Sequence, residues 1–342
     1  MKTSDRPLYA VDAGGSTTSV AAFDGIRWTG PSVNPSSVGP EKSARHLRNV
    51  LDDIRRHADR SGRGAKPAIW LASASLSPRS PGHEVRRIGG MAREAGLSGE
   101  LVVSNDVTPL VLTPSADIGR VVTVCGTGSG FVASDGHSPP AQIGGCEYLG
   151  SDEGSAFDLG LRGLRAAVRG LDGRAPFTTL TGLLEAEAEA PMRDLARALA
   201  AEPFPKTCVA ALAPIVMRAW LGGDTVATDL VRSAISELVL GVKAVRDLAS
   251  LLPGWCLSVT GGVMTACPEF YDQFAAQAGE PLGAASVMLV ADPAAEVLST
   301  LARLTTSDGI WLPGPWLGKH AWHIDLGDNN RGNRQGGGRP AR

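Results

Sequence analysis

The sequence has no long hydrophobic run and little excess of charge of either sign. It contains no stretch of about 18 uncharged apolar residues, and its start runs into a strand pattern without the apolar core of a signal peptide. The 33 basic and 35 acidic residues leave a formal net charge of −2. Such a chain offers no broad basic field for a nucleic-acid backbone or an anionic membrane. We therefore expect a cytoplasmic protein with no nucleic-acid or membrane partner.

The sequence also lacks paired cysteines and two familiar nucleotide-binding motifs. Its five cysteines are scattered, odd in number and never in a Cys-x-x-Cys pair, which is typical of a protein from a reducing compartment. Neither the G-x-G-x-x-G fingerprint of dinucleotide-binding folds nor a Walker A loop is present. If the protein binds a nucleotide, it does so with other elements.

The apolar residues that are present suffice for two hydrophobic cores. Hydrophobic residues make up 43% of the 342 positions, and the chain exceeds the size at which a single core stops growing. We predict domain I at residues 1–113, domain II at 114–292 and a C-terminal helix at 293–324 that returns to domain I. Residues 325–342 are rich in Gly, Asn and Arg, so we predict a disordered tail there.

Apolar periodicity predicts strands early in each half of the chain and long helices later. Strands are expected at residues 8–12, 17–23, 68–72, 101–103, 121–125, 130–134, 256–259 and 285–290. Helices are expected at 41–60, 83–95, 153–169, 177–190, 206–221, 225–252 and 266–278. Residues 8–23 and 121–134 share one layout of strand, Gly and hydroxyl turn, and second strand. We interpret this as a distant internal duplication in which each half begins with a hairpin.

The turn after the first predicted strand has the composition of an anion-binding nest. It follows Asp12 and contains Gly14, Gly15, Ser16, Thr17 and Thr18. Small residues let backbone N–H groups approach phosphate oxygens, and the hydroxyls add donors. The carboxylate of Asp12 at the strand end is placed to hold Mg²⁺, directly or through water. The alternative for this segment alone is a plain hairpin turn with a capping aspartate.

Two further glycine segments make nucleotide binding the better interpretation. The second turn contains Gly126, Thr127, Gly128 and Ser129, and again joins two apolar strands. Two such turns on two half-chains can clamp one polyphosphate from opposite sides, so the pair is more specific than either turn. Gly261 and Gly262 close a strand and open a helix, where N–H groups and a flat glycine surface suit an adenosine. We therefore predict ATP as the cofactor.

The order of these motifs resembles the N-acetylglucosamine kinase-like family, of BadF/BadG/BcrA/BcrD type, in the sugar kinase, actin and Hsp70 superfamily. The matching segments are residues 12–18, 105–106, 125–129, 144–145, 152–155 and 260–262. This resemblance implies an α/β fold of two actin-like ATPase domains (ribonuclease H-like), each a mixed β-sheet with flanking helices, and ATP in the cleft between them. It also implies a kinase that uses ATP and Mg²⁺ to phosphorylate a hydroxyl of an amino sugar: N-acetylglucosamine, glucosamine or a related compound. A homodimer is compatible with the resemblance.

The resemblance assigns catalysis to Asp106. In this family an aspartate at the end of the domain I sheet accepts the proton of the sugar hydroxyl that attacks the γ-phosphate, and Asp106 matches that position. An apolar run at residues 101–103 precedes it, so its carboxylate is expected at a strand end, where positioning dominates phosphoryl transfer. The structural alternative is a helix N-cap, although Val107 and Pro109 make a poor capping box.

The sugar site implied by the resemblance includes both asparagines and acidic residues. The expected substrate-binding residues, some of them only adjoining the matched positions, are Asn34, Asn105, Gly145, Cys146, Glu147, Asp152 and Glu153. Asn34 is also a common turn residue before proline, and acidic residues at a helix start also stabilise the helix dipole.

Three segments depart from the family pattern, and one of them, residues 71–76, replaces a Gly-containing turn that in relatives lies near the N-acetyl group of the sugar. Relatives carry an aromatic residue or His and then Gly where this chain has Cys146 and Glu147. If Glu147 faces the pocket, it needs a cation or several hydroxyls, and a free-amine substrate would supply one. The alternative is that Glu147 points into solvent. Residues 292–297 lack the Gly-Ala pair that usually opens the C-terminal helix, which leaves the packing of that helix in doubt.

Two other functions stay open at this stage. One is an actin-like ATPase that activates a partner reductase or dehydratase, which would need cysteines to bridge an iron–sulfur cluster between subunits. The other is a sugar-binding regulator with a degraded active site, for which the departures from the family pattern are the only support.

Overall fold

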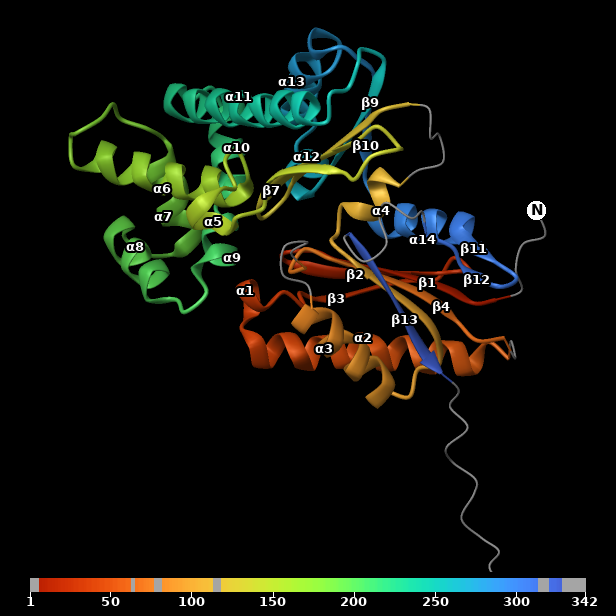
Figure 1. Cartoon of the computed structure of the whole chain (residues 1–342). Helices are drawn as coiled ribbons and strands as arrows, with labels where there is room; N and C mark the ends of the chain where they lie inside the picture. The colour runs from red at the N-terminus through yellow and green to blue at the C-terminus, as the bar shows by residue number, and fades with distance from the viewer. Residues whose placement is uncertain (1–5, 63–64, 77–81, 113–117, 313–319, 328–342) are drawn as a thin grey trace, which may run out of the picture.

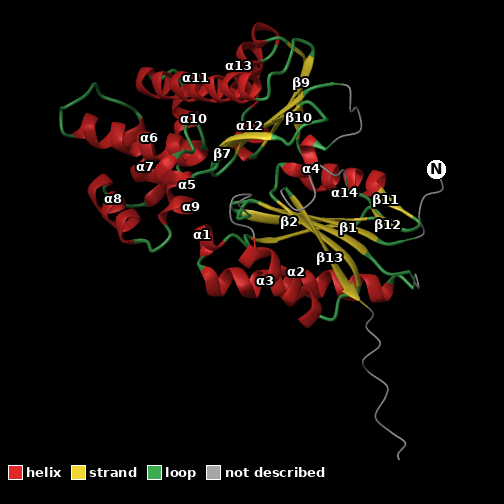
Figure 2. Ribbon diagram, in the orientation of Figure 1, coloured by secondary structure: helices red, strands yellow, loops and turns green. Residues whose placement is uncertain are grey.

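Two β-sheets with flanking helices form the framework of the molecule (Figures 1 and 2). The computed structural model describes residues 6–62, 65–76, 82–112, 118–312 and 320–327. We call the six-stranded sheet with helices α1 to α4 and α14 lobe I, and the five-stranded sheet with helices α5 to α13 lobe II. The α/β class with a mixed sheet in each half is confirmed. The exact domain boundaries at residues 113 and 292 stay a prediction.

The secondary structure follows the chain in this order. The strands are β1 (Leu8–Ala13), β2 (Thr17–Ala22), β3 (Arg27–Pro31), β4 (Ala68–Ser73), β5 (Gly99–Ser104), β6 (Arg120–Cys125), β7 (Ser129–Ser134), β8 (Ala141–Gly144), β9 (Trp255–Thr260), β10 (Ala284–Val290), β11 (Thr305–Thr306), β12 (Gly309–Ile310) and β13 (Ala321–Gly327). The helices are α1 (Pro35–Val38), α2 (Pro40–Arg60), α3 (Gly82–Glu94), α4 (Thr108–Val111), α5 (Glu147–Gly150), α6 (Ala156–Leu171), α7 (Leu180–Ala188), α8 (Met192–Ala201), α9 (Pro205–Ala210), α10 (Ala213–Leu221), α11 (Thr225–Leu248), α12 (Gly262–Ala266), α13 (Pro268–Ala278) and α14 (Pro293–Leu304), with a short 3-10 turn at Glu280–Leu282.

The two sheets share one topology, which supports the predicted duplication. In lobe I the order β3-β2-β1-β4-β5 begins with antiparallel pairs and continues with parallel ones. In lobe II the order β8-β7-β6-β9-β10 repeats that arrangement. Each half therefore begins with a hairpin, as predicted, and the two hairpin turns hold corresponding places in the two sheets.

The core of lobe I follows the period-two alternation of its strands. One face carries Val11, Leu71 and Val103, which are buried against the apolar side of α2 and α3. The opposite face carries small residues and Trp70, which are buried against α14. Because the helices cover both faces, the central strands are apolar throughout, as sheets buried on both sides are.

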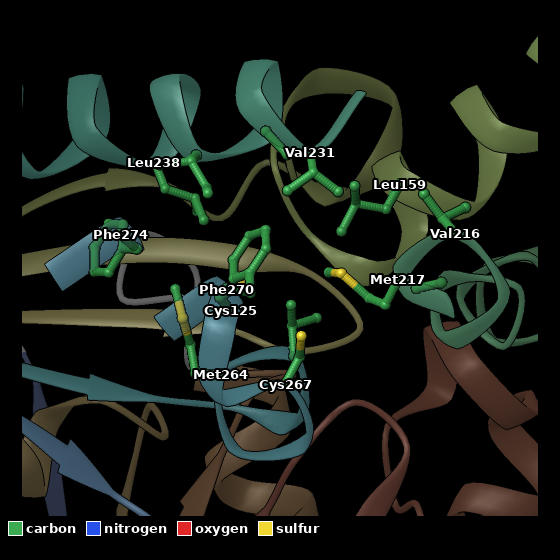
Figure 3. Close-up of a cluster of buried hydrophobic side chains, with 14 of the residues drawn as sticks. Cys125, Leu159, Val216, Met217, Val231, Leu238, Met264, Cys267, Phe270 and Phe274 are labelled. Atoms are coloured by element: carbon green, nitrogen blue, oxygen red, sulfur yellow. The ribbon is translucent and has the colours of Figure 1, made fainter. Parts of the chain in front are cut away.

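The core of lobe II lies between its sheet and a group of long helices. Figure 3 shows Leu238 of α11 and Phe270 and Phe274 of α13 beside Cys125 of β6, all buried. The other face of this sheet contributes Val122 and Val132 to a smaller cluster that includes residues of α4.

The C-terminal part of the chain returns to lobe I. Helix α14 begins with Asp292 as N-cap, whose side chain accepts a hydrogen bond from the Ala295 backbone N–H at 2.9 Å. Its residues Val297 and Leu301 are fully buried against the sheet, so the helix packs closely despite the missing Gly-Ala pair.

The prediction of a disordered tail is wrong for residues 325–327, which form the end of strand β13. Strand β13 pairs antiparallel with β5 and runs to Gly327. Trp322, Ile324 and Leu326 alternate with polar residues and pack on the lobe I core. The prediction missed this strand because the residues that follow it are rich in Gly, Asn and Arg. The rest of the predicted tail, 328–342, lies outside the described residues.

Most predicted elements are present, and the misses have simple causes. The eight predicted strands match β1, β2, β4 to β7, β9 and β10, whereas β3, β8 and β11 to β13 were missed. The predicted C-terminal helix at 293–324 is wrong beyond Leu304, where α14 ends and the short strands begin. The helix predicted at 206–221 is two helices, because Pro214 stands in the first turn of α10. Helix α8 was also missed, since Met192 is its one buried residue.

Candidate active site

A cavity of about 800 Å³ lies between the two lobes and collects most of the predicted site residues. The predicted residues that line it are Asp12, Gly14, Gly15, Ser16, Thr17, Asn34, Asn105, Asp106, Gly126, Thr127, Gly128, Ser129, Gly145, Glu147, Asp152, Gly261 and Gly262. Three predicted residues do not line it. Thr18 is fully buried in β2, while Cys146 and Glu153 are exposed outside the cavity wall. The predicted roles of these three residues in ligand binding stay predictions.

The first glycine turn joins β1 to β2 at the cavity wall. The carbonyl oxygen of Gly14 accepts a hydrogen bond from Ser32 Oγ at 3.1 Å, while Ser16 and Thr17 are exposed. The Ser16 hydroxyl hydrogen-bonds the Thr127 hydroxyl of the second turn. The two turns thus face each other across the cleft, as a clamp on one polyphosphate requires.

The second glycine turn is held by the chain that follows it. Asp152 Oδ1 accepts a hydrogen bond from the Ser129 backbone N–H at 3.0 Å, and Ser129 Oγ donates to the Glu153 carbonyl at 2.9 Å. The backbone N–H of Ala156 donates to the Gly126 carbonyl at 2.9 Å. A Cβ at Gly128 would lie 2.6 Å from Asp152 Oδ1, so a larger residue there would displace the carboxylate that holds this turn.

The third glycine element lies where β9 meets α12. Gly261 has a φ of 110°, and a Cβ on it would overlap the carbonyl group of Cys125 at the end of β6. The adjacent Gly262 has no atom within 4 Å of its Cβ position. The first glycine therefore permits the close approach of two strand ends, while the second leaves open space toward the cavity.

Two aspartates of lobe I line the cavity without an ion-pair partner among the described residues. Burial, reinforced by the nearby charges of Asp106 and Asp292, raises the pKa of Asp12 to about 7. Burial raises the pKa of Asp106 to about 6, although the Val107 and Asp106 backbone N–H groups lower it in part. Asp106 does not cap α4, whose N-cap residue is Val107. Both carboxylates are thus held where a cation or a proton would stabilise them.

The two predicted asparagines hold the local backbone. Asn34 Oδ1 accepts a hydrogen bond from the Ser36 backbone N–H at 2.9 Å and caps α1, which is the turn role given as the alternative. Asn105 Oδ1 accepts from the Val107 backbone N–H at 3.1 Å, and its Nδ2 donates to the Leu76 carbonyl at 3.1 Å. Asn105 thereby fixes the turn that carries Asp106. A direct role of either asparagine in sugar binding stays a prediction.

A buried lysine joins the two acidic residues on the lobe II wall. Lys206 Nζ lies 2.8 Å from Asp152 Oδ2 and 3.1 Å from Glu147 Oε2. The Lys206 and Asp152 side chains are 10% and 5% exposed, and that of Glu147 is 51% exposed. Burial lowers the pKa of Lys206, but the ion pairs with Asp152 and Glu147 raise it by a larger amount. The net result is a pKa above the usual value of lysine. We call Asp152, Lys206 and Glu147 the charge trio.

The charge trio corrects the expectation for Glu147. That expectation assumed a pocket-facing carboxylate without a protein partner, which a substrate amine would satisfy. Glu147 instead has the Lys206 ammonium, and its Oε1 accepts a hydrogen bond from Ser36 Oγ at 3.1 Å. Glu147 therefore does not need a substrate amine as its partner, and the expected preference for a free-amine sugar no longer follows from this residue.

Lys206 lines the cavity and was not among the predicted site residues. It was assigned only to the start of a helix, and it stands in the first turn of α9 after Pro205. A cation there is unfavourable for the helix dipole, which is the one sequence signal that could have marked it. Gln142 and residues of α10, including Met217, also line the cavity and were not predicted.

The described residues contain neither a ready-made metal cluster nor a single membrane-spanning helix. No group of three or more His, Cys, Asp or Glu side chains in them could hold a metal ion. No single helix in them has the length and apolar character needed to cross a membrane, although the strongly bent pair Pro205–Leu221 and Thr225–Leu248 together meets that test.

Known families and proteins that resemble this chain are ATPases and sugar kinases. The model of the BadF/BadG/BcrA/BcrD ATPase family matches residues 11–273. An N-acetylmuramic acid/N-acetylglucosamine kinase from Clostridium acetobutylicum is 29% identical over 189 residues, which are 55% of this chain and 62% of that relative. The match thus spans less than two thirds of the relative's length.

Solved structures of low sequence identity share the fold. A protein from Porphyromonas gingivalis assigned as an N-acetylglucosamine kinase has a TM-score of 0.66 at 18% identity, over 86% of this chain and 99% of that chain. One from Chromobacterium violaceum with the same assignment has a TM-score of 0.62 at 24% identity, over 86% and 98%. A glucokinase of the ROK family from Streptomyces griseus has a TM-score of 0.51 at 15% identity, over 87% and 98%. The predicted two-domain actin-like ATPase fold is confirmed.

Proposed function

The chain belongs to the BadF/BadG/BcrA/BcrD ATPase family, and we propose that it is an ATP-dependent kinase that phosphorylates a hydroxyl of an amino sugar. One observation carries the proposal. Two turns of glycine and hydroxyl residues meet across a cavity of about 800 Å³, through the Ser16 and Thr127 hydroxyls, and the Asp106 carboxylate lines the same cavity. A phosphate clamp beside a carboxylate is the arrangement that phosphoryl transfer to a hydroxyl requires.

The nucleotide is accommodated by three glycine elements. The turns at Gly14–Ser16 and Gly126–Gly128 present backbone N–H groups and hydroxyls for the phosphates. The surface at Gly262, with Met217 and Val263 on the same cavity wall, suits the adenosine. Membership of an ATPase family supports ATP as the nucleotide.

Asp12 fits the predicted magnesium ion. It is a partly buried carboxylate close enough to Asp106 for mutual repulsion, and partial desolvation together with this repulsion raises its pKa. A hard divalent cation takes carboxylate oxygens as ligands and would offset this repulsion. When bound, Mg²⁺ supplies positive charge that neutralises the phosphate oxygens.

Asp106 is the group that would accept the proton of the attacking hydroxyl. With a pKa of about 6 it is mostly ionised at pH 7, yet basic enough to take a proton as the oxygen attacks the γ-phosphorus. The Asn105 side chain fixes the backbone of this turn through the Val107 N–H and the Leu76 carbonyl. The chain thus positions the base, and the cleft between the lobes keeps water from competing as acceptor.

The amino-sugar acceptor is supported by the relative that acts on such sugars, the N-acetylmuramic acid/N-acetylglucosamine kinase. The part of the cavity wall formed by Asn34, Gly145 and the charge trio offers polar groups for sugar hydroxyls. A cytoplasmic location and a homodimer stay predictions.

The alternative role as an activator of a reductase receives little support from the two cysteines near the predicted binding segments, because Cys146 is exposed but Cys125 is buried. Cys125 is fully buried, its Sγ donates to the Gly154 carbonyl, and burial raises the pKa of its thiol. A cluster that bridges two subunits needs thiolates at the surface.

The direct test is a coupled assay of ADP release with Mg²⁺-ATP across sugars, amino sugars and aminocyclitols, with the phosphorylated product identified by mass spectrometry. Sugar-dependent ADP release with a matching sugar phosphate is the expected result. ADP release that no sugar stimulates, together with bound iron, would instead indicate the activator role.

A further inference from the structure

The second glycine turn is held by a buried carboxylate whose charge has one compensating group. Asp152 is 4% exposed, and its Oδ1 accepts a hydrogen bond from the Ser129 backbone N–H at 3.0 Å. Its other oxygen, Oδ2, is buried and forms no hydrogen bond of normal angle with the described residues. The Lys206 ammonium, with Nζ at 2.8 Å from Oδ2, is what compensates the charge of this carboxylate.

The position of Asp152 makes this compensation important for an anionic ligand. The carboxylate lies directly against Gly128, since a Cβ on that glycine would be 2.6 Å from Oδ1. Negative charges within a few ångströms of each other repel strongly in a cleft of low polarity. A buried carboxylate without a partner is also costly in itself. Without Lys206, Asp152 would therefore both oppose a phosphate at this turn and lose the reason to stay buried beside it.

Lys206 also holds the segment of chain that carries Asp152. Asp152 has a φ of 77° and Glu147 has a φ of 60°, so both have left-handed backbone conformations that side chains other than glycine rarely adopt. Such conformations persist where surrounding contacts hold them. Both residues pair with the Lys206 ammonium, whose side chain is 10% exposed. One cation thus fixes the two unusual backbone positions of residues 147–152.

We propose that Lys206 is a positioning residue for the nucleotide, which acts through Asp152 to keep the second glycine turn in the geometry that receives phosphate. This inference rests on the proposed kinase function, because it assumes that the turn binds the phosphates of ATP. It does not require that Lys206 touch the ligand. Loss of the ammonium should weaken binding of a triphosphate, whereas adenosine alone, which lacks phosphates, should bind as before.

The proposal predicts that a second substitution repairs the first. Asparagine at position 152 keeps an oxygen that can accept the Ser129 backbone N–H, but it carries no charge that needs the ammonium. Asp152→Asn in the Lys206→Met background should therefore restore phosphate binding. A lysine that only fills space, or that binds the phosphate itself, would not be replaced in this way.

The experiment measures Kd for β,γ-imido-ATP with Mg²⁺, and for adenosine, by isothermal titration calorimetry. The variants are Lys206→Met, Asp152→Asn and the double variant of both. Glu147→Gln removes the half-exposed partner of the same lysine and leaves the buried pair intact. Lys243→Met, which removes an exposed and ion-paired lysine of α11, is the matched control. The melting temperature of each variant shows whether it is folded.

We expect Lys206→Met to weaken binding of the triphosphate analogue at least about tenfold and that of adenosine less than about twofold. The double variant should bind the analogue within about threefold of the wild type. Glu147→Gln and Lys243→Met should also stay within about threefold. Should Lys206→Met fail to fold, Lys206→Gln, which keeps an N–H donor without the charge, takes its place with the same expected outcomes.

Three results overturn the role of Lys206: unchanged affinity of the lysine variant for the analogue, an equal loss of affinity for adenosine, or a loss that Asp152→Asn does not repair. Failure of the proposed function looks different. A wild type that binds the analogue but phosphorylates no sugar contradicts the kinase proposal and leaves this inference standing. A wild type that binds neither the analogue nor adenosine contradicts both.

Discussion

The two walls of the cleft treat their charged groups in opposite ways. On the lobe I wall, Asp12 and Asp106 have no ion-pair partner among the described residues, and burial raises both pKa values. On the lobe II wall, Asp152 and Glu147 share the Lys206 ammonium, and Asp152 also receives a backbone N–H. The lobe I carboxylates are therefore available to a metal ion or a proton. The lobe II carboxylates are instead paired within the protein, where Asp152 also holds the second glycine turn.

This contrast predicts that substitutions in the two walls have different consequences. A change at an unpaired carboxylate of lobe I should remove chemistry without loss of structure. A change in the packed elements of lobe II should alter structure or ligand binding first.

The largest effect is expected for Asp106→Asn. Loss of the general base should lower kcat by at least about 100-fold, while the affinity for Mg²⁺-ATP stays within about twofold, because the phosphates bind to the glycine turns. Steady-state kinetics and nucleotide titration measure the two quantities. Asp229→Asn, an exposed aspartate on α11, is the control. Substantial turnover by the Asp106 variant would remove this residue from the mechanism.

The next effect concerns the packing of lobe II and is tested by two adjacent glycines. Gly261→Ala should lower the free energy of unfolding by about 3 kcal/mol, because its φ of 110° and the contact with the Cys125 carbonyl both disfavour a side chain. Gly262→Ala should cost less than about 1 kcal/mol, since nothing lies within 4 Å of its Cβ position. Urea unfolding compares them, and equal losses would contradict the described approach of β9 to β6.

The dependence of stability on pH should separate the two walls. The folded pKa values of Asp12 and Asp106, about 7 and about 6, exceed the unfolded value of about 3.9, so the folded protein binds more protons between these values. Their contribution to stability is present at low pH and is lost as the pH rises through about 6 and 7. The raised pKa of Lys206 contributes no slope in this range.

The free energy of unfolding without nucleotide and Mg²⁺ should therefore fall from pH 5 to pH 8, by on the order of 4 kcal/mol from these two groups. The double variant Asp12→Asn, Asp106→Asn should flatten this decrease, and Lys206→Met should retain it. Denaturant unfolding at several pH values provides the measurement. If the double variant shows the same decrease as the wild type, groups other than Asp12 and Asp106 cause the dependence of stability on pH.

The smallest effect is expected where the two walls touch. Ser36→Ala removes the hydrogen bond from lobe I to Glu147, and should raise KM for the sugar about two- to fivefold while kcat changes less than twofold. Ser236→Ala, which removes an exposed hydroxyl on α11, should change neither constant. A large loss of kcat in Ser36→Ala would show instead that this contact controls the chemical step.

Much of the fold and most of the cavity-lining residues could be predicted because their signals are local. The pattern of two apolar strands around a Gly and hydroxyl turn occurs at Gly14 and again at Gly126, and both form the predicted hairpins. Asp106 follows an apolar strand, so the sequence predicted its position beyond the C-terminal end of that strand. Edge strand β13 was missed although apolar and polar residues alternate along it, because it precedes a Gly-rich segment and its pairing depends on a partner far away in the chain.

By itself the sequence determined the backbone of each half: the strands, the hairpins and the glycine positions that a phosphate can approach. These depend on the conformational preferences of neighbouring residues and on burial patterns with periods of two to four residues. Only the tertiary structure decided how the charges pair. Glu147 and Lys206 are 59 residues apart, and Ser36 lies 111 residues from Glu147. Which of these groups meet is set by the packing of whole helices and sheets, and charge pairing over such separations leaves no periodic pattern in the chain.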